Sequence, residues 1–297
     1  MTKTATAVRQ PLGAIEPGLA TSQASRPRAR HVERITSGRS QGPITRLMSP
    51  SDLGELVKPF VFLDLAEVPY TGRKLFGMHP HSGIATLTTV LQGGFSYEDT
   101  TGKRGVVERG GLEWMRAGRG VWHDGAPIPG EPLRVFQLWI ALPQSEEASP
   151  PESQYIGADA VHANGPVRVI LGQHGDARGV IRAPSGIDYF HVQLADGERW
   201  RYSPPTGHNV AWLAVDRGRL WAPEVVSTGQ LAIFEESEAA IEVVARGDVS
   251  FVFGSAVKHG HPLVLGDYSV HTSPEALANG EAEIERIGKQ LRADGRI

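Results

Sequence analysis

Glycine and proline interrupt this chain at short intervals, and brief apolar runs lie between them. The 297 residues include 35 glycines and 21 prolines. Proline breaks helices, and both residues mark tight turns, so long helices have little room between these positions. Short apolar segments separated by frequent turn signals are typical of all-β proteins. We therefore predict an all-β fold built from many antiparallel strands.

The expected strands fall into two groups. Residues 142–154, rich in proline, serine and glutamate, break the pattern between the groups and form the predicted domain boundary. Each group contains an apolar strand that runs into a glycine turn, at residues 88–94 and 213–219, and this internal similarity indicates a duplicated β-barrel. The strands are expected at 60–68, 85–92, 111–117 and 134–143, and then at 167–173, 189–195, 209–218, 229–234, 239–245 and 249–255.

The N-terminal segment differs from the rest of the chain. Residues 1–30 show no hydrophobic periodicity and end in a basic string that contains Arg26, Arg28 and Arg30. We interpret this segment as a flexible, solvated arm. A localisation signal or a contact with an anionic partner is the alternative, because such short basic clusters serve both purposes.

The C-terminal end carries a helix signal. Thr272 and Glu275 have the spacing of a capping box, and apolar residues at helical intervals follow them. One or two short helices are expected here, with Gly280 as a possible break. The predicted units are therefore an arm at 1–30, a first domain at 31–146, a second domain at 147–272 and a helical segment at 273–297 that packs back on the first domain.

Composition excludes several classes of function. The formal net charge of −3 offers no basic surface for a phosphate backbone, so direct binding of nucleic acid is not expected. The chain has no cysteine, so any bound metal must be held by nitrogen and oxygen ligands. Neither a stretch of about 18 apolar residues nor the apolar core of a signal peptide is present. A soluble, cytoplasmic protein without membrane contact is expected.

Two histidines stand one residue apart before a long apolar run. Side chains two residues apart leave a strand on the same face, so His79 and His81 should project together. His123 follows on a second strand-like segment, and three imidazoles could converge inside one barrel. Neutral imidazoles suit Fe, Ni, Cu, Zn or Mn and leave coordination positions open. The alternative is a barrel without metal, in which the rings bond to one another or to water.

The run HPHSGIATLTTVLQGGFSYEDTTGKRGVVERGGLEWMRAGRGVWHDG at 79–125, followed by FQLWIALP at 136–143, resembles the pirin family. The resemblance extends more weakly to KPFVFLDLAEV upstream and to TGHNVAWLAVDRG, GQLAIF and HGHPLVLGDYSVHTSPEAL downstream. It implies a bicupin, with two antiparallel jelly-roll barrels and a divalent metal in the first. Some members of that family resemble flavonol dioxygenases that open quercetin with oxygen, and others act as nuclear, redox-sensitive co-regulators of transcription.

Carried over by position, the resemblance assigns metal ligation to His79, His81 and His123. The family's two acidic positions correspond to Gly125 and Ala85, so both carboxylates are missing. A site with three nitrogen ligands leaves the charge of a divalent ion uncompensated, which weakens both metal retention and the case for flavonol chemistry. Asp124 could replace the missing ligand only at a strand bulge. Glu98 and Glu113 are expected at the solvent side or the rim.

The second half should lack a metal site. Aligned on Gly218 and Gly93, the positions of the histidine pair are taken by Pro204 and Thr206. His208 is expected in a loop or at the rim. The later histidines are assigned to structure or to loops, and barrel packing accounts for the six tryptophans, with Trp122 facing away from the metal. The histidines assigned in this way are His162, His174, His259, His261 and His271.

Two functional hypotheses follow. The first is a mononuclear metal-binding cupin of the quercetin 2,3-dioxygenase type, which holds one divalent ion, with Fe(II) preferred, and binds a small, flat aromatic substrate in an apolar pocket. The second is a non-enzymatic binding or regulatory protein that uses the metal as a structural or redox-sensing element and contacts a protein partner. A bicupin that has lost its metal is a third option. A monomer is expected in each case.

Overall fold

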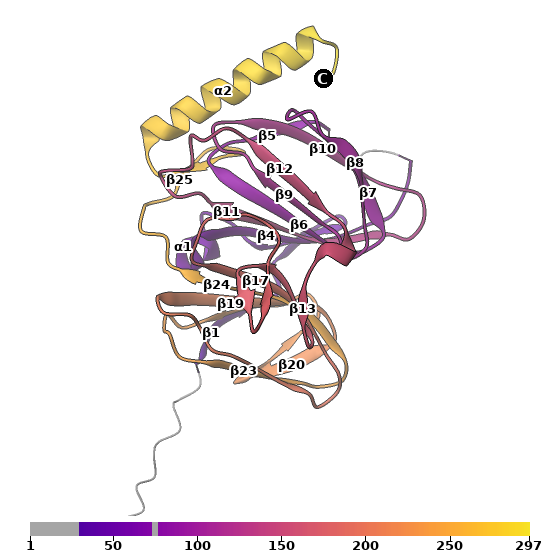
Figure 1. The fold of residues 1–297 in the computed structure, drawn as a ribbon, viewed down its shortest axis with the longest axis vertical. Coiled ribbons are helices and arrows are strands. Elements are labelled where there is room, and N and C mark those ends of the chain that lie inside the picture. Colours follow the sequence, from indigo (N-terminus) through magenta and orange to yellow (C-terminus); the bar gives the residue numbers. More distant parts are fainter. Residues whose placement is uncertain (1–29, 73–76) are drawn as a thin grey trace, which may run out of the picture.

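A computed structural model describes residues 30–72 and 77–297. It contains two β-barrels, one above the other, and a C-terminal helix that lies across the outer side of the first barrel (Figure 1). The predicted arm at 1–30 lies outside the described residues except for Arg30. Arg30 is fully buried rather than solvated, and its guanidinium donates to the backbone carbonyls of Glu235 and Asn209.

The first barrel consists of a large sheet and a small sheet. The large, seven-stranded sheet has the order β12-β9-β6-β11-β4-β3-β2, and the four-stranded sheet has the order β5-β10-β7-β8. The strands are β2 (Arg39–Gln41), β3 (Ile44–Met48), β4 (Phe60–Val68), β5 (His79–His81), β6 (Ile84–Gln92), β7 (Gly94–Asp99), β8 (Arg104–Glu108), β9 (Leu112–Arg116), β10 (Val121–Pro127), β11 (Leu133–Ala141) and β12 (Glu152–Ile156).

The second barrel has the same construction. Its seven-stranded sheet has the order β1-β22-β19-β24-β17-β14-β13, and its four-stranded sheet has the order β18-β23-β20-β21. The strands are β1 (Val32–Thr36), β13 (Ala163–Asn164), β14 (Val167–Leu171), β17 (Ile187–Leu194), β18 (Arg199–Tyr202), β19 (His208–Arg217), β20 (Arg219–Ala222), β21 (Glu224–Ser227), β22 (Leu231–Phe234), β23 (Ile241–Ala245) and β24 (Val249–Val257).

Short elements connect these sheets. The helix α1 (Leu53–Val57) precedes β4, and the 3₁₀ helix η1 (Ala158–Ala160) lies between the barrels. Two further pairs of short strands are β15 (Gln173–His174) with β16 (Ala177–Arg178), and β25 (Val264–Leu265) with β26 (Val270–His271). The predicted all-β class is confirmed, because α2 (Pro274–Ala293) is the one long helix of the described chain.

The two barrels match strand for strand, which confirms the predicted duplication. Reading the large sheets in parallel pairs β9 with β22, β6 with β19, β11 with β24 and β4 with β17, and the small sheets pair β5 with β18. The edge strands of the two large sheets do not follow the predicted domain boundary at residue 147. The edge strand of the second barrel is β1, from the start of the chain, whereas β12, from beyond the expected boundary, completes the first barrel.

Strand alternation divides each large sheet into two faces. On β11, Phe136 and Leu138 point to a core shared with the second barrel, where Tyr189 and Trp212 are fully buried. The intervening residues of β11 face the interior of the first barrel instead. The barrels are therefore joined by the backs of their large sheets, and each small sheet closes its own barrel on the far side.

A buried ion pair crosses this shared face. Arg134 on β11 donates from Nε to Oδ1 of Asp216 (2.6 Å) and from Nη2 to the backbone carbonyl of the same residue (2.8 Å). Glu67 also pairs with Arg134. Arg134 and Asp216 are both buried, so the pair depends on mutual neutralisation.

The helix α2 differs from its prediction at two points. The N-cap is Ser273, whose hydroxyl accepts from the Ala276 amide, because the Thr272 hydroxyl donates to Glu147 instead. Gly280 does not break the helix. A Cβ at this position would lie 2.5 Å from Nε2 of His271 and 2.6 Å from Oγ of Ser82, so the glycine permits close packing of the helix on the first barrel. Within residues 30–72 and 77–297, no helix is long and apolar enough to cross a membrane.

Candidate metal centre

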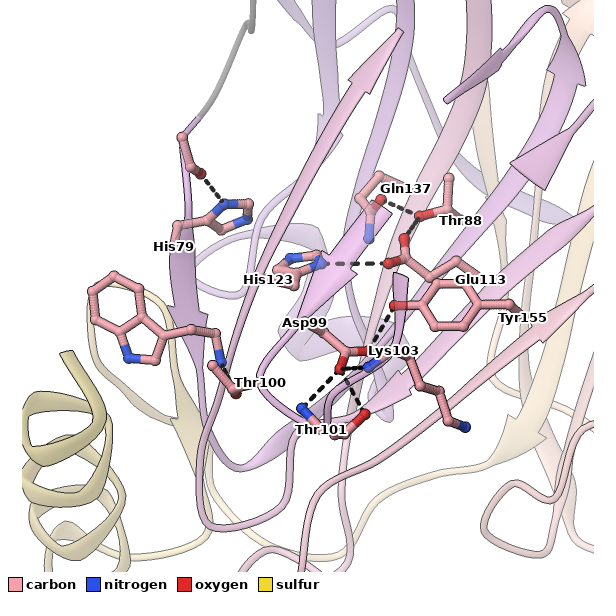
Figure 2. Close-up of polar contacts among 12 residues, drawn as sticks. His79, Thr88, Asp99, Thr100, Thr101, Lys103, Glu113, His123, Gln137 and Tyr155 are labelled. Atoms are coloured by element: carbon pink, nitrogen blue, oxygen red, sulfur yellow. Dashed lines mark hydrogen bonds and ion pairs between the residues drawn. The ribbon is translucent and has the colours of Figure 1, made fainter. Parts of the chain in front are cut away.

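Two neighbouring strands of the small sheet carry the three histidines. His79 and His81 occupy alternate positions of β5, and His123 on β10 pairs directly with His79 in the strand register. One potential ligand atom from each ring lies within 4.8 Å of the other two. The predicted convergence of the three imidazoles is confirmed, and the close-up shows His123 between His79 and Glu113 (Figure 2).

Each ring has an oxygen atom beside its Nδ1. His79 Nδ1 lies 2.9 Å from the Gly77 carbonyl, and His81 Nδ1 lies 3.0 Å from the Tyr268 carbonyl. A carbonyl can only accept, so these contacts place the proton on Nδ1 and leave the Nε2 lone pair available to a metal. Nε2 of His123 is buried and has no hydrogen-bond partner. A buried polar atom without a partner is costly, and a metal ion would satisfy it.

Electrostatics keep the pair on β5 neutral. Burial, followed by repulsion from His123, lowers the pKa of His79 to about 4. The same two causes, with His79 as a further contributor, lower the pKa of His81 well below its ordinary value. Metal ligation requires neutral imidazole, so the surroundings favour the ligating form at neutral pH.

Glu113 was expected at the solvent side or the rim, and this prediction is wrong. The side chain is buried within the first barrel, with the residue only 3% exposed. Its Oε1 lies 3.4 Å from Nδ1 of His123, and its Oε2 accepts from the Thr88 hydroxyl at 2.7 Å. Burial raises the pKa of Glu113, but the hydrogen bonds from His123 and Thr88 outweigh it and leave the pKa below its ordinary value.

A row across three strands of the large sheet holds this carboxylate. Glu113 on β9 pairs with Thr88 on β6, which in turn pairs with Gln137 on β11. The Gln137 side chain lies 2.6 Å from the Thr88 hydroxyl. The row faces the barrel interior and reaches His123 on the opposite, small sheet (Figure 2). Alternation along β9 places Glu113 on one of two faces, but the sequence alone does not say which of these faces is interior. The burial of Glu113 could therefore not be predicted.

A cavity of about 770 Å³ opens beside the histidines. Its size is that of typical small-molecule pockets. Trp139 forms one wall, where it stacks on Phe62 at a centroid distance of 4.2 Å and meets the His81 ring edge-on at 4.9 Å. The guanidinium of Arg46 covers the Phe62 ring at 3.9 Å. The apolar part of the wall also includes Ile44, Ala66, Val68, Phe95, Leu133 and Val135.

The family resemblance marks positions 125 and 85 as acidic, and the structure places these two positions in different surroundings. Gly125 lies two residues beyond His123 and lines the cavity, and a Cβ there would meet nothing closer than Phe95 at 3.4 Å. Ala85 is fully buried. Asp124 pairs with Glu98 in regular register, without a bulge, so alternation keeps it off the face that carries His123.

Other predictions around the first barrel have mixed outcomes. Trp122 faces away from the histidines, as expected, and its Nε1 donates to the Ile284 carbonyl of α2 at 2.8 Å. Glu98 is exposed, as expected, and pairs with Arg296. His271 is structural, since its ring lies 3.0 Å from the Ser82 hydroxyl. Trp139 departs from the packing role expected of the tryptophans, because it lines the cavity.

Two details of the second barrel were predicted wrongly. Pro204 and Thr206 follow the strand that matches β5 rather than lying in it, because the intervening loops differ in length between the barrels. The inward residues of that strand, β18, are Trp200 and Tyr202. His208 is buried at the start of β19, with Nδ1 3.8 Å from Asp188, and is not a rim residue. The absence of metal ligands from this barrel stays a prediction.

The architecture, two cupin barrels joined back to back, defines a bicupin. Residues 43–140 match the model of the pirin family. A Pseudomonas aeruginosa protein named "Putative quercetin 2,3-dioxygenase PA2418" is 31% identical over 267 residues, which cover 84% of this chain and 93% of that protein. A "Pirin-like protein" of Caulobacter vibrioides is 32% identical, with 82% of this chain and 91% of that protein covered. The chain belongs to the pirin family.

Solved structures show the same fold. The crystal structure of a quercetin 2,3-dioxygenase from Acinetobacter baumannii matches with a TM-score of 0.75 at 24% identity, over 88% of this chain and 95% of that one. The bacterial pirin YhhW from Escherichia coli, solved in complex with nickel(II), matches with a TM-score of 0.58 at 21% identity, over 74% and 94%. These structures show the fold, and the cluster of His79, His81 and His123 in this chain could hold a metal ion.

Proposed function

We propose that the first barrel binds one divalent metal ion through His79, His81 and His123. The observation that carries this proposal is the convergence of the three rings at a cavity, with the Nε2 atom of His123 buried and without a hydrogen-bond partner. Three imidazoles form a common metal-binding set that leaves positions open for a further ligand. The donor set suits several late first-row ions, and we take Fe(II) as the functional one.

We further propose that the protein is a dioxygenase of the quercetin 2,3-dioxygenase type, acting on a flavonol or a related enolic aromatic molecule. The names of its relatives support this class of reaction. A redox-active ion in the site would supply the activation of oxygen. The Trp139 ring, stacked on Phe62 and next to His81, lines the cavity with a flat apolar surface that suits a planar aromatic substrate.

The surrounding residues prepare this chemistry. The carbonyls of Gly77 and Tyr268 hold the pair on β5 with Nε2 available, and Glu113 does the same for His123. The apolar part of the cavity wall lowers the local dielectric beside the histidines, which strengthens electrostatic contacts within the site. Gly125 leaves the space beside His123 open for a substrate.

Elemental analysis of protein purified without a histidine tag tests the metal proposal. We expect about one divalent ion per chain in the wild-type protein and almost none in His81→Ala. Oxygen uptake with quercetin and with a panel of catechols tests the activity. Uptake that requires His81 supports the dioxygenase, and a metal-free wild-type protein would contradict both proposals.

A non-enzymatic, regulatory role is the second candidate. It is favoured by the lack of a carboxylate at position 125, in the cavity wall next to His123, because positioned bases contribute about 10²–10⁴-fold to proton transfer. Stoichiometric metal without oxygen uptake across the whole panel would favour this role and a protein partner. The expectations of a monomer and of a cytoplasmic location stay predictions, which gel filtration with light scattering and cell fractionation can test.

A further inference from the structure

Glu113 stands out among the acidic residues near the three histidines. It comes from the large sheet and crosses the barrel interior to His123 on the small sheet. One carboxylate oxygen is held by Thr88 at 2.7 Å, which leaves the other directed at Nδ1 of His123. The carboxylate thus stands behind one ligand rather than within the ligand set.

The three histidines differ in what supports them. His79 and His81 contact neutral backbone carbonyls, whereas His123 contacts a buried carboxylate. A carboxylate that accepts from the Nδ1 proton makes the imidazole a stronger electron donor than a carbonyl does. His123 is therefore the histidine through which the protein can transmit negative charge to an ion.

We propose that Glu113 is a positioning residue that compensates, through His123, for the negative charge that position 125 lacks. This inference rests on the proposed metal binding by the three histidines. Three neutral imidazoles leave the full dipositive charge of the ion in a buried site. Adjacent strands fix the order of Glu113, Thr88 and Gln137. Thr88 binds one carboxylate oxygen of Glu113, which orients the other oxygen toward His123.

Titration of the metal-free protein with Co(II) tests the proposal. Glu113→Gln preserves the shape and a hydrogen-bond acceptor but removes the charge. We expect it to weaken Co(II) binding about 10- to 100-fold, the usual cost of losing such a partner of a ligating histidine. Glu98→Gln is the matched control, because it removes an exposed carboxylate from the same barrel. It should leave the dissociation constant unchanged.

Gly125→Glu provides an independent second variant. The position lines the cavity and has room for a Cβ. In the Glu113→Gln background the new carboxylate should restore at least 10-fold of the lost affinity. In the wild-type background it should add less than about 10-fold, since Glu113 already provides the charge. The thermal unfolding temperature of each metal-free variant shows whether it folds.

The outcomes separate the inference from the proposed function. If wild type and Glu98→Gln both fail to bind Co(II), the metal proposal is wrong and the role of Glu113 falls with it. If wild type binds and Glu113→Gln binds equally well, the inference alone is wrong. If Glu113→Gln does not fold, Gly125→Glu in the wild-type background still provides a test. A gain in Co(II) affinity of more than 10-fold would overturn the inference, because it would show that Glu113 leaves the charge of the ion uncompensated.

Discussion

The two barrels share one strand order but differ in what fills them. In the second barrel, Phe253 lies at the centre of an aromatic cluster with Phe190, Trp200 and Tyr202, at centroid distances of 4.7–6.1 Å. In the first barrel, the corresponding interior contains a cavity of about 770 Å³. The strand of the second barrel that corresponds to β5 is β18. It carries Trp200 and Tyr202, whereas β5 carries His79 and His81.

This difference shows that the barrel itself does not determine a site. Alternation along each strand delivers one set of side chains to the interior in both barrels. Large aromatic residues turn that interior into core, whereas smaller apolar residues and polar groups leave a pocket. Duplication therefore yields one barrel with a packed aromatic interior and one barrel with a cavity, without a change of topology.

The largest expected effect comes from removing an aromatic ring from the packed interior of the second barrel. Phe253→Ala should lower the free energy of unfolding by about 3–5 kcal/mol, because the large buried ring leaves a cavity. Val135→Ala, on the cavity wall of the first barrel, should cost only about 1 kcal/mol, since part of its side chain already borders open space. Urea denaturation followed by tryptophan fluorescence measures both. Equal losses would contradict the contrast between the barrels.

The interface between the barrels should be nearly as sensitive. Asp216→Ala leaves Arg134 buried with Glu67 as its one ionic partner among the described residues and should cost about 3 kcal/mol in urea denaturation. Replacing both partners by apolar residues, as in Arg134→Met with Asp216→Leu, should restore most of this loss. A double variant no more stable than Asp216→Ala would show that the ion pair has a further role.

Metal should stabilise one barrel only. At a free Co(II) concentration 100 times its dissociation constant, the wild-type protein should gain about 2.7 kcal/mol. His81→Ala should lose this gain, whereas Phe253→Ala should keep it, because its defect lies in the other barrel. Calorimetric scans with and without Co(II) measure the gain. A response that survives in His81→Ala would place the ion elsewhere.

The second barrel should carry a pH dependence that does not involve metal. Burial, reinforced by Arg168, lowers the pKa of His191 to about 4. The unfolded chain binds a proton near pH 6.5, so stability should fall as the pH decreases from 6.5 to 4, by about 2–3 kcal/mol. His191→Gln should flatten this part of the stability curve. Parallel curves for the two proteins, measured by urea denaturation, would contradict the assignment.

Much of this structure could be predicted from the sequence, and the failures have physical causes. Strand positions such as 60–68 followed from apolar runs between turns, and the grouping of His79, His81 and His123 followed from strand alternation and the family resemblance. Burial of Glu113 could not be predicted, because alternation identifies two faces of a strand without saying which one is interior. Only the folded barrel places its carboxylate beside His123.

Other misses came from contacts between distant parts of the chain. Gly280 suggests a helix break when considered alone, but Ser82 and His271 approach it so closely that only glycine fits within the helix. Arg30 has the character of a solvated arm, yet it is buried against the second barrel. Such contacts leave no local pattern in the sequence.

The pairing of β1 with β22 has a consequence for synthesis. Val32 is made early, but its partner Phe234 leaves the ribosome only after the whole first barrel has been translated. Domains generally fold as units and from the N-terminus, so the first barrel can close first, while β1 stays unpaired until the second barrel is made. A nascent chain halted before Phe234 would display β1 as an unpaired strand open to other chains.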